Sequence, residues 1–155
     1  MTIWAFSALV SRRLWRWNVI NMVAGALLVG RTGFWRGFGS QNLAWGVINI
    51  AIAVFGTVAN RRRLKTIADP LAPQVVAKET HNLRRLLLIN AGLDVVYMLG
   101  GWRFAASSTD AQRQGVGWGI VLQGALLLIF DVTQAAQVPN VTLKDAADDA
   151  AHHRL

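Results

Sequence analysis

The sequence contains no cysteine, which excludes disulfides, catalytic thiolates and cysteine-ligated zinc within one chain. Its three histidines, His81, His152 and His153, all lie in polar segments, so no apolar segment offers a histidine pair for haem. His152 and His153 are a minor candidate for weak metal binding, and a terminal segment without a binding role is the simpler interpretation. We therefore expect no cofactor and no metal site.

Charged side chains are also scarce, at 15% of residues, while 54% of residues are hydrophobic. A soluble domain usually has about a quarter charged residues, so this composition predicts an integral membrane protein. The formal net charge of +8 also fits nucleic-acid binding. Accumulation of Lys and Arg on the cytoplasmic side of spanning helices explains the charge with fewer assumptions. Membrane lipids, and no nucleic acid, are the expected partners.

Proline occurs only three times, and no proline lies within a long apolar segment. The sequence has four such segments, each long enough to cross roughly 30 Å of hydrocarbon as a helix. Uninterrupted apolar runs favour helices over the alternating strands of a barrel. The predicted fold is therefore all-α, a bundle of four transmembrane helices. The segments are residues 14–30, 42–59, 83–102 and 115–133, within one membrane domain of residues 14–135.

Residues 1–13 precede the first segment and are apolar but too short to span a membrane. We expect them to lie along the membrane interface, with Trp4 and Phe6 in the lipid.

The basic residues predict the orientation of the four segments. With both termini in the cytoplasm, twelve of the 16 Lys and Arg residues face inward, and only Arg31, Arg36, Arg103 and Arg113 face outward. In this topology residues 60–82 are a cytoplasmic loop, in which Pro73 begins a helix that runs into the third span. Residues 136–155 form a cytoplasmic tail.

Two short motifs recur and indicate an internal repeat. "RWNVIN" (Arg16–Asn21) matches "RLLLIN" (Arg85–Asn90), and "AWGVI" in the second segment resembles "GWGIV" in the fourth. They predict two helical hairpins inserted in the same orientation, with a pseudo-two-fold axis along the membrane normal. Chance similarity between apolar segments is the alternative. In this alignment Asp94 corresponds to Gly25, so the acid is not repeated.

Four polar residues are predicted to meet near the middle of the membrane. Asp94 and Tyr97 share one face of the third segment. At about 1.5 Å per residue, Asp94 lies roughly 13 Å from Arg85. Asn49 and Gln123 are expected at a similar depth in the second and fourth segments. The candidate intramembrane polar site is therefore Asp94, Asn49, Gln123 and Tyr97.

A second polar layer is predicted nearer the cytoplasm. It contains amides from the first and third segments and an acid from the fourth, which is a candidate ion partner for an arginine. The layer comprises Asn21, Asn90, Asp131, Arg16 and Arg85.

Two main interpretations of these polar residues stay open. In the first, they are hydrogen-bonding contacts that hold four short helices in register. In the second, Asp94 lines a path for a proton, a cation or a polar solute, because intramembrane acids mark such pathways. A lipid- or quinone-binding pocket is a third, minor interpretation.

Enzymatic chemistry has little support, and we predict that the protein is not an enzyme. Asp94 has no second acid beside it and no intramembrane histidine. "GFWRGFG" lacks the Lys-Ser/Thr of a phosphate-binding loop. In "GVGWG", Gly115 and Gly119 predict a close helix contact, whereas Gly33 and Gly37 are expected in a loop.

Three stretches, "FWRGFGSQNLAWGVIN", "RRLLLINAGLDVVYMLGG" and "GWGIVLQGALLLIFD", resemble a family of uncharacterised small bacterial four-span membrane proteins. The likeness covers most of residues 30–135 and implies no catalytic residue. We expect a non-enzymatic accessory, assembly or structural component of the bacterial inner membrane, which meets a protein partner or a second copy of itself. The alternative is a small ion, proton or polar-solute channel or transporter centred on Asp94.

The predicted topology can be tested with a single cysteine introduced at Lys65. A membrane-impermeant thiol reagent added to sealed cells should leave this cysteine unlabelled, because the position is predicted to face the cytoplasm. A cysteine at Arg31, on the predicted outer side, should react and serves as the control. Labelling at position 65 with protection at position 31 would reverse the orientation.

Overall fold

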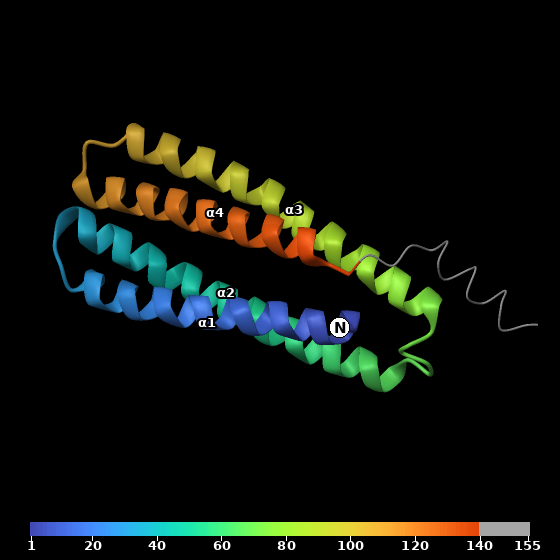
Figure 1. Cartoon of the computed structure of the whole chain (residues 1–155). Coiled ribbons are helices and arrows are strands. Elements are labelled where there is room, and N and C mark those ends of the chain that lie inside the picture. The colour runs from blue at the N-terminus through green and yellow to red at the C-terminus, as the bar shows by residue number, and fades with distance from the viewer. Residues whose placement is uncertain (140–155) are drawn as a thin grey trace, which may run out of the picture.

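The computed structural model describes residues 1–139, which form four α-helices and no β-strand (Figure 1). The predicted all-α fold with four helices is confirmed, and each helix is longer than the apolar segment that predicted it. Most of the predicted tail, including His152 and His153, lies outside the described residues. The helices are α1 (Ile3–Val29), α2 (Gly33–Thr66), α3 (Pro73–Ala106) and α4 (Ala111–Gln137).

Each helix begins at a residue suited to a first turn. Thr2 and Asp110 cap α1 and α4, because their side-chain oxygens accept hydrogen bonds of 3.2 and 2.8 Å from backbone N–H groups one turn ahead. Pro73 lies in the first turn of α3, as predicted, where its missing N–H costs nothing. Gly33 begins α2 with φ +55°, a left-handed conformation that glycine adopts without strain.

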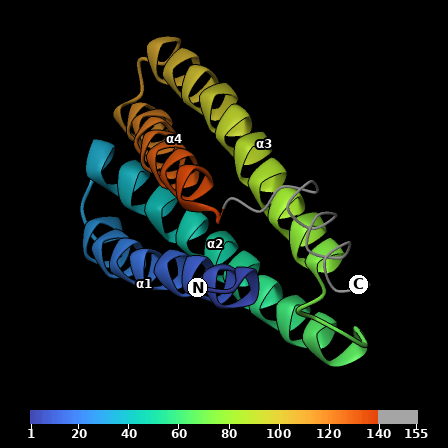
Figure 2. The same ribbon diagram turned by 45° about the vertical axis from the view of Figure 1, so that its right-hand side comes forward.

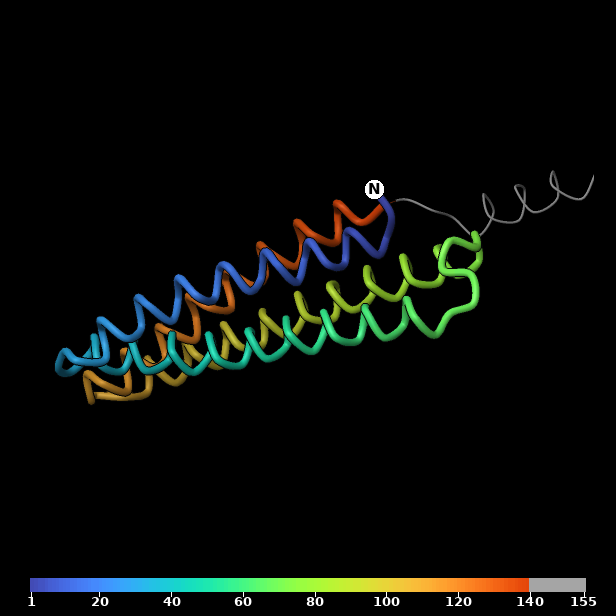
Figure 3. Tube along the Cα trace, turned by 90° about the horizontal axis from the view of Figure 1, so that it is seen from below, coloured from blue at the N-terminus to red at the C-terminus, as the bar shows by residue number. Residues whose placement is uncertain are grey.

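The four helices form two antiparallel hairpins, α1 with α2 and α3 with α4 (Figure 2). The hairpins join through α2 and α4, while α1 and α3 hardly touch. Residues 30–32 and 107–110 connect the helices within each hairpin and lie at one end of the molecule (Figure 3). Residues 67–72 connect the hairpins at the other end, near the N-terminus. This arrangement makes α2 and α4 run in the same direction.

A pair of glycines brings the backbones of α2 and α4 into contact. A Cβ added to Gly37 would lie 1.9 Å from the carbonyl oxygen of Gln112, and one added to Gly115 would lie 1.9 Å from that of Phe34. Neither position accommodates a side chain without separating the helices. The close contact predicted at Gly115 is confirmed. The prediction of a loop at Gly33 and Gly37 is wrong, because both belong to α2 and Gly37 packs against α4.

Glycines also set the contacts inside each hairpin, at matching positions. A Cβ on Gly39 would lie 2.8 Å from the carbonyl oxygen of Gly25, and one on Gly117 would lie 2.6 Å from that of Gly101. These contacts define a structural alignment of the hairpins, in which Gly25 of α1 corresponds to Gly101 of α3 and Gly39 of α2 corresponds to Gly117 of α4. The two hairpins therefore repeat the same packing.

A second set of contacts follows the same structural alignment. Gly46 lies against Met22, and Gly124 lies against Met98. The predicted alignment of "RWNVIN" with "RLLLIN" and of "AWGVI" with "GWGIV" is wrong, because it pairs residues that occupy different places in the two hairpins. In the structural alignment "NVINMVAG" (residues 18–25) matches "DVVYMLGG" (residues 94–101). Asp94 therefore corresponds to Asn18, and not to Gly25.

The start of α1 is buried in protein, which contradicts the interfacial position predicted for residues 1–13. Trp4 is 6% exposed and Phe6 is 1% exposed. They pack in an apolar cluster with Leu87 of α3 and Ala135 of α4. Trp4 Nε1 also donates a hydrogen bond of 2.8 Å to the carbonyl oxygen of Pro70. The prediction failed because α3 and α4 extend far enough to cover an apolar surface that lipid would otherwise cover.

The predicted loop of residues 60–82 is mostly helical. Since α2 continues to Thr66 and α3 begins at Pro73, only residues 67–72 lie outside the helices. An ion pair between Arg63 and Glu79 joins the two helical extensions.

Two of the four described helices, α2 and α4, are long and apolar enough to cross a membrane. In the most apolar 18-residue stretch of each helix, only 22% of residues are buried in α2 and 39% in α4. A core helix of a soluble protein is mostly buried. The other two helices are more polar. Arginines interrupt α1 at positions 12, 13 and 16, and Asn90 and Asp94 lie within the apolar part of α3.

Replacing Gly115 by Ala tests the contact between the hairpins. The added methyl group has no room beside the Phe34 carbonyl, so we expect a loss of about 1–3 kcal/mol in unfolding free energy, as overpacking usually causes. Gly92→Ala is the matched control, because no atom lies within 4 Å of its added Cβ. Thermal unfolding in detergent, followed by circular dichroism, provides the measurement. Equal melting temperatures for the two variants would contradict the contact.

Candidate functional site

The interior of the bundle contains many polar side chains. Among the described residues, the largest side chains with less than 2% exposure are Phe6, Gln123 and Asn18, so two of the three are amides. Within residues 1–139, the buried polar or charged residues are Asn18, Asn21, Asn42, Asn49, Thr80, Asp94, Gln123, Asp131 and Gln134. Many large apolar side chains point outward, which is unlike a soluble protein.

Gln123 is the centre of a hydrogen-bond chain that crosses three helices. Its Oε1 accepts a hydrogen bond of 3.2 Å from Nδ2 of Asn21 in α1. Its Nε2 donates to Oδ1 of Asn42 in α2. Asn42 Nδ2 in turn donates to the carbonyl oxygen of Phe38, at 2.8 Å. The chain thus links α1, α4 and α2 through buried amides, whose bonds would be costly to leave unmade.

A second amide pair lies within the first hairpin. Asn49 Nδ2 of α2 donates to Asn18 Oδ1 of α1 at 3.1 Å. Asn18 Nδ2 donates to the carbonyl oxygen of Leu14 at 2.8 Å. Asn18 therefore uses both its acceptor and its donor, and it fixes the register of α1 on α2.

Asp94 and Asp131 are buried acids of the second hairpin. Asp94 is 4% exposed, and its Oδ2 has no hydrogen-bond partner within residues 1–139. Asp131 is 7% exposed and interacts electrostatically with Asp94. The two acids therefore face a common region between α3 and α4.

The structure places three of the four predicted site residues in the interior, but in different pairs. Asn49 bonds to Asn18, and Gln123 bonds to Asn21 and Asn42, so neither amide binds the other or Asp94. The fourth, Tyr97, is 41% exposed. Its ring packs edge-on against Trp45 of α2, with 5.1 Å between ring centroids. The hydrogen bonds of Asn49 and Gln123 therefore do not join these two residues to one another or to Asp94.

The second predicted layer is also divided. Asn21 joins the Gln123 chain, and Asn90 is only half-buried. Arg16 and Arg85 do not join it, because both are exposed. Arg63 and Glu79 form an ion pair, but within residues 1–139 Asp131 does not form the predicted ion pair with Arg16 or Arg85.

The sequence interpretation missed Asn18, Asn42 and Gln134 as interior residues. Gln134 accepts a hydrogen bond of 2.9 Å from Arg13, which ties α4 to α1. A signal for Asn18 was present, because "NVINMVAG" aligns with "DVVYMLGG". The shorter motif ending in "IN" obscured this alignment.

The repeat shows where the two hairpins differ chemically. Asn18 corresponds to Asp94, and its partner Asn49 corresponds to Leu127, so the second hairpin has an acid without the amide that would bind it. The second acid, Asp131, corresponds to Ala53. The two buried acids therefore belong to the second hairpin alone. Within the residues described, no group of three or more His, Asp or Glu side chains is placed to hold a metal ion.

This difference predicts opposite effects of leucine at the two equivalent positions. Asn18→Leu removes the partner of Asn49, so we expect a loss of about 1 kcal/mol or more in unfolding free energy. Asp94→Leu removes a buried oxygen that has no partner, so we expect unchanged or higher stability. Thermal unfolding of both variants in one detergent provides the comparison. A larger loss for Asp94→Leu than for Asn18→Leu would show that Asp94 is the more important structural contact.

Comparison with known proteins gives one match. A family model described as "Family of unknown function (DUF6992)" matches residues 13–132. No curated protein matches the chain, and no solved structure matches it. The matched region includes every buried amide and acid described above except Gln134.

Proposed function

The chain belongs to this family of unknown function, and we propose that it is a non-enzymatic integral membrane protein with an accessory, assembly or structural role. It crosses the bacterial inner membrane four times, with both termini in the cytoplasm. Its contacts are with lipid and with either a protein partner or a second copy of the chain.

The observation that supports a membrane location is the distribution of side chains between interior and surface. Phe55, Leu27 and Ile129 are 76%, 72% and 64% exposed, while the interior holds amides and acids. Soluble proteins rarely expose contiguous apolar surfaces of this extent. In lipid the same distribution is favourable, because apolar side chains face hydrocarbon and polar groups bind one another inside the bundle.

The helix lengths fit a bundle that projects beyond the membrane on one side. At about 1.5 Å per residue, helices of this length extend roughly 40–50 Å, against about 30 Å of hydrocarbon. The excess lies at the end that carries Arg61–Lys65 and the Arg63–Glu79 pair. The arginines of α1 lie near the same boundary, where long basic side chains reach the headgroups.

A structural role is supported by the way the interior amides are used. Asn18, Asn21 and Gln123 each bond to another interior group. Their hydrogen bonds fix helix register, so these amides are not left to bind a substrate. The surface that remains for function is the lipid-facing exterior and the cytoplasmic end, which suits a protein that supports others in the membrane.

A second candidate is a small channel or transporter for protons, cations or polar solutes. Asp94 and Asp131 support it, because they are buried, near one another and absent from the first hairpin. A buried acid with an oxygen that accepts no hydrogen bond, as in Asp94, lowers stability and is usually retained for function.

A flux assay separates the two candidates. The accessory role predicts that liposomes containing the purified chain carry no proton, Na⁺ or K⁺ flux above empty liposomes. Transport predicts a flux that Asp94→Asn abolishes without loss of thermal stability. Asp69→Asn is the matched control, because it makes the same chemical change at an exposed turn.

Membrane integration is tested separately by alkaline carbonate extraction. The wild-type chain should stay in the membrane pellet, because its exposed apolar surface is buried only in lipid. Its recovery in the soluble fraction would overturn both candidates.

A further inference from the structure

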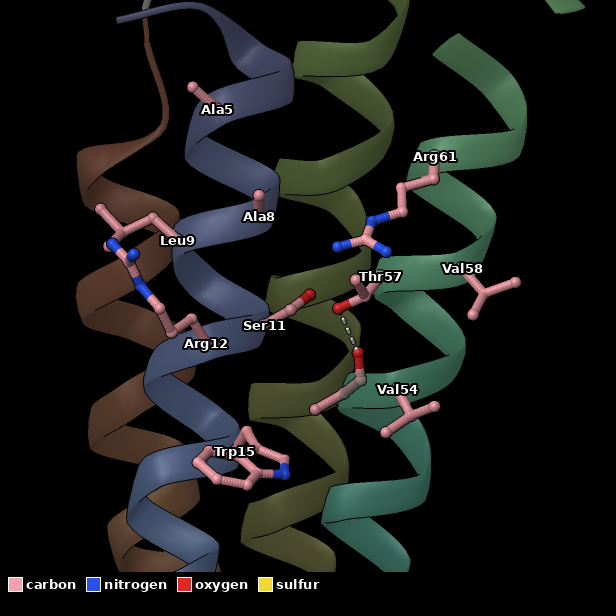
Figure 4. Close-up of a pocket in the computed structure, with 11 residues that line it drawn as sticks. Ala5, Ala8, Leu9, Ser11, Arg12, Trp15, Val54, Thr57, Val58 and Arg61 are labelled. Carbon is pink, nitrogen blue, oxygen red and sulfur yellow. Dashed lines mark hydrogen bonds between the residues drawn. The ribbon is translucent and has the colours of Figure 1, made fainter. Parts of the chain in front are cut away.

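An open groove of about 570 Å³ lies between the first half of α1 and the second half of α2. Ala8, Ser11 and Trp15 line it from α1, and Thr57 and Arg61 line it from α2. Figure 4 shows the side chains of Ser11 and Trp15 pointing toward α2, with the Arg61 guanidinium extending from α2 above Ser11 and Thr57. The groove therefore has an apolar wall and a basic, hydroxyl-lined end.

The charge of this groove is positive and not neutralised by the described part of the chain. Arg61 makes no ion pair within residues 1–139, whereas the nearby Arg63 is paired with Glu79. Arg12 also borders the groove, on the side of α1 away from Arg61 (Figure 4). None of the lining residues is acidic.

The polar groups match the chemistry of a phosphodiester. A guanidinium offers forked N–H donors that fit phosphate oxygens. The Ser11 hydroxyl is a further donor below Arg61, and it has no described partner, whereas Trp15 lies at the other end of the groove (Figure 4). Thr57 is different, because its hydroxyl donates to the carbonyl oxygen of Ala53 at 2.8 Å. Below these donors, Val54 and Trp15 provide an apolar wall suited to an acyl chain (Figure 4).

The groove is not a general property of the hairpin fold. In the structural alignment Ser11 corresponds to Leu87, and Trp15 corresponds to Ala91. On α2, Thr57 corresponds to Ala135 and Arg61 to Pro139. The second hairpin thus has apolar residues at all four positions, and Leu87 and Ala135 are buried there.

We propose that this groove binds one anionic phospholipid of the inner leaflet, with its phosphate held by Arg61 and Ser11 and an acyl chain along Val54 and Trp15. The inference rests on the proposed membrane location. Ser11 lies about 27 Å along α1 from Val29, which is the level of the inner headgroups when Val29 lies at the outer boundary. Basic pockets between helices on this side of a membrane are suited to anionic headgroups.

Native mass spectrometry of the full chain in detergent tests the groove. The probes are phosphatidylglycerol and phosphatidylcholine with identical oleoyl chains, supplied in equal amounts. The wild type should retain more phosphatidylglycerol. Arg61→Gln should lower the ratio of bound phosphatidylglycerol to phosphatidylcholine about fivefold, the effect of one basic residue near an anionic headgroup. Arg62→Gln is the matched control, since it removes the same charge from an adjacent exposed residue outside the groove.

Three results would overturn the proposal: an equal ratio in wild type and Arg61→Gln, an equal fall in Arg62→Gln, or binding of inorganic phosphate that displaces the lipid. Should Arg61→Gln fail to fold, Ser11→Leu, which introduces the residue of the second hairpin, must lower phosphatidylglycerol binding in its place. Thermal unfolding verifies that each variant is folded. Retention in the membrane after carbonate extraction, with no lipid preference, overturns the groove alone, whereas release from the membrane overturns the proposed location.

Discussion

The close approach of α2 and α4 at Gly37 and Gly115 is the constraint on which the rest of the structure depends. Each glycine lies against a carbonyl oxygen of the opposite helix, so the two backbones are in direct contact. Contacts of this kind leave no space for large side chains near the crossing. They also fix the rotation of both helices, because Gly37 and Gly115 must each face the opposite backbone. A contact between backbone atoms therefore sets the position of one hairpin relative to the other.

A bundle held by small residues needs another source of specificity, and the buried amides provide it. Glycine contacts alone specify helix register weakly, because a helix shifted along its partner can place another small residue at the same contact. The chain from Asn21 through Gln123 to Asn42 has partners in one register only. A shift of one turn would leave buried donors and acceptors unpaired, at a cost of about 1–3 kcal/mol each. Close packing and polar pairing are thus complementary in this interior.

The sequence predicted the four helices and their order, because apolar runs of this length have few other stable forms. It also predicted that Asn49, Asp94 and Gln123 lie in the interior, since they share faces with small or apolar residues. It did not predict their partners, because partner choice depends on helix rotation and register. The information for register was present in the glycines of "GFGSQNLAWG" and "GVGWGIVLQG", which share the spacing G-x-G-x₆-G. Only backbone contacts show that these glycines face equivalent partners.

The two kinds of amide contact imply an order of assembly. Asn18 and Asn49 belong to one hairpin, whose helices are joined by the short connection of residues 30–32, so their bond can form as soon as α2 has been synthesised. Gln123 belongs to the last helix and bonds to both helices of the first hairpin. Until α4 arrives, Asn21 and Asn42 lack this partner. The first hairpin can therefore form its own Asn18–Asn49 bond before the second hairpin is made. Its Asn21 and Asn42 side chains gain their Gln123 partner only when α4 of the second hairpin packs against it.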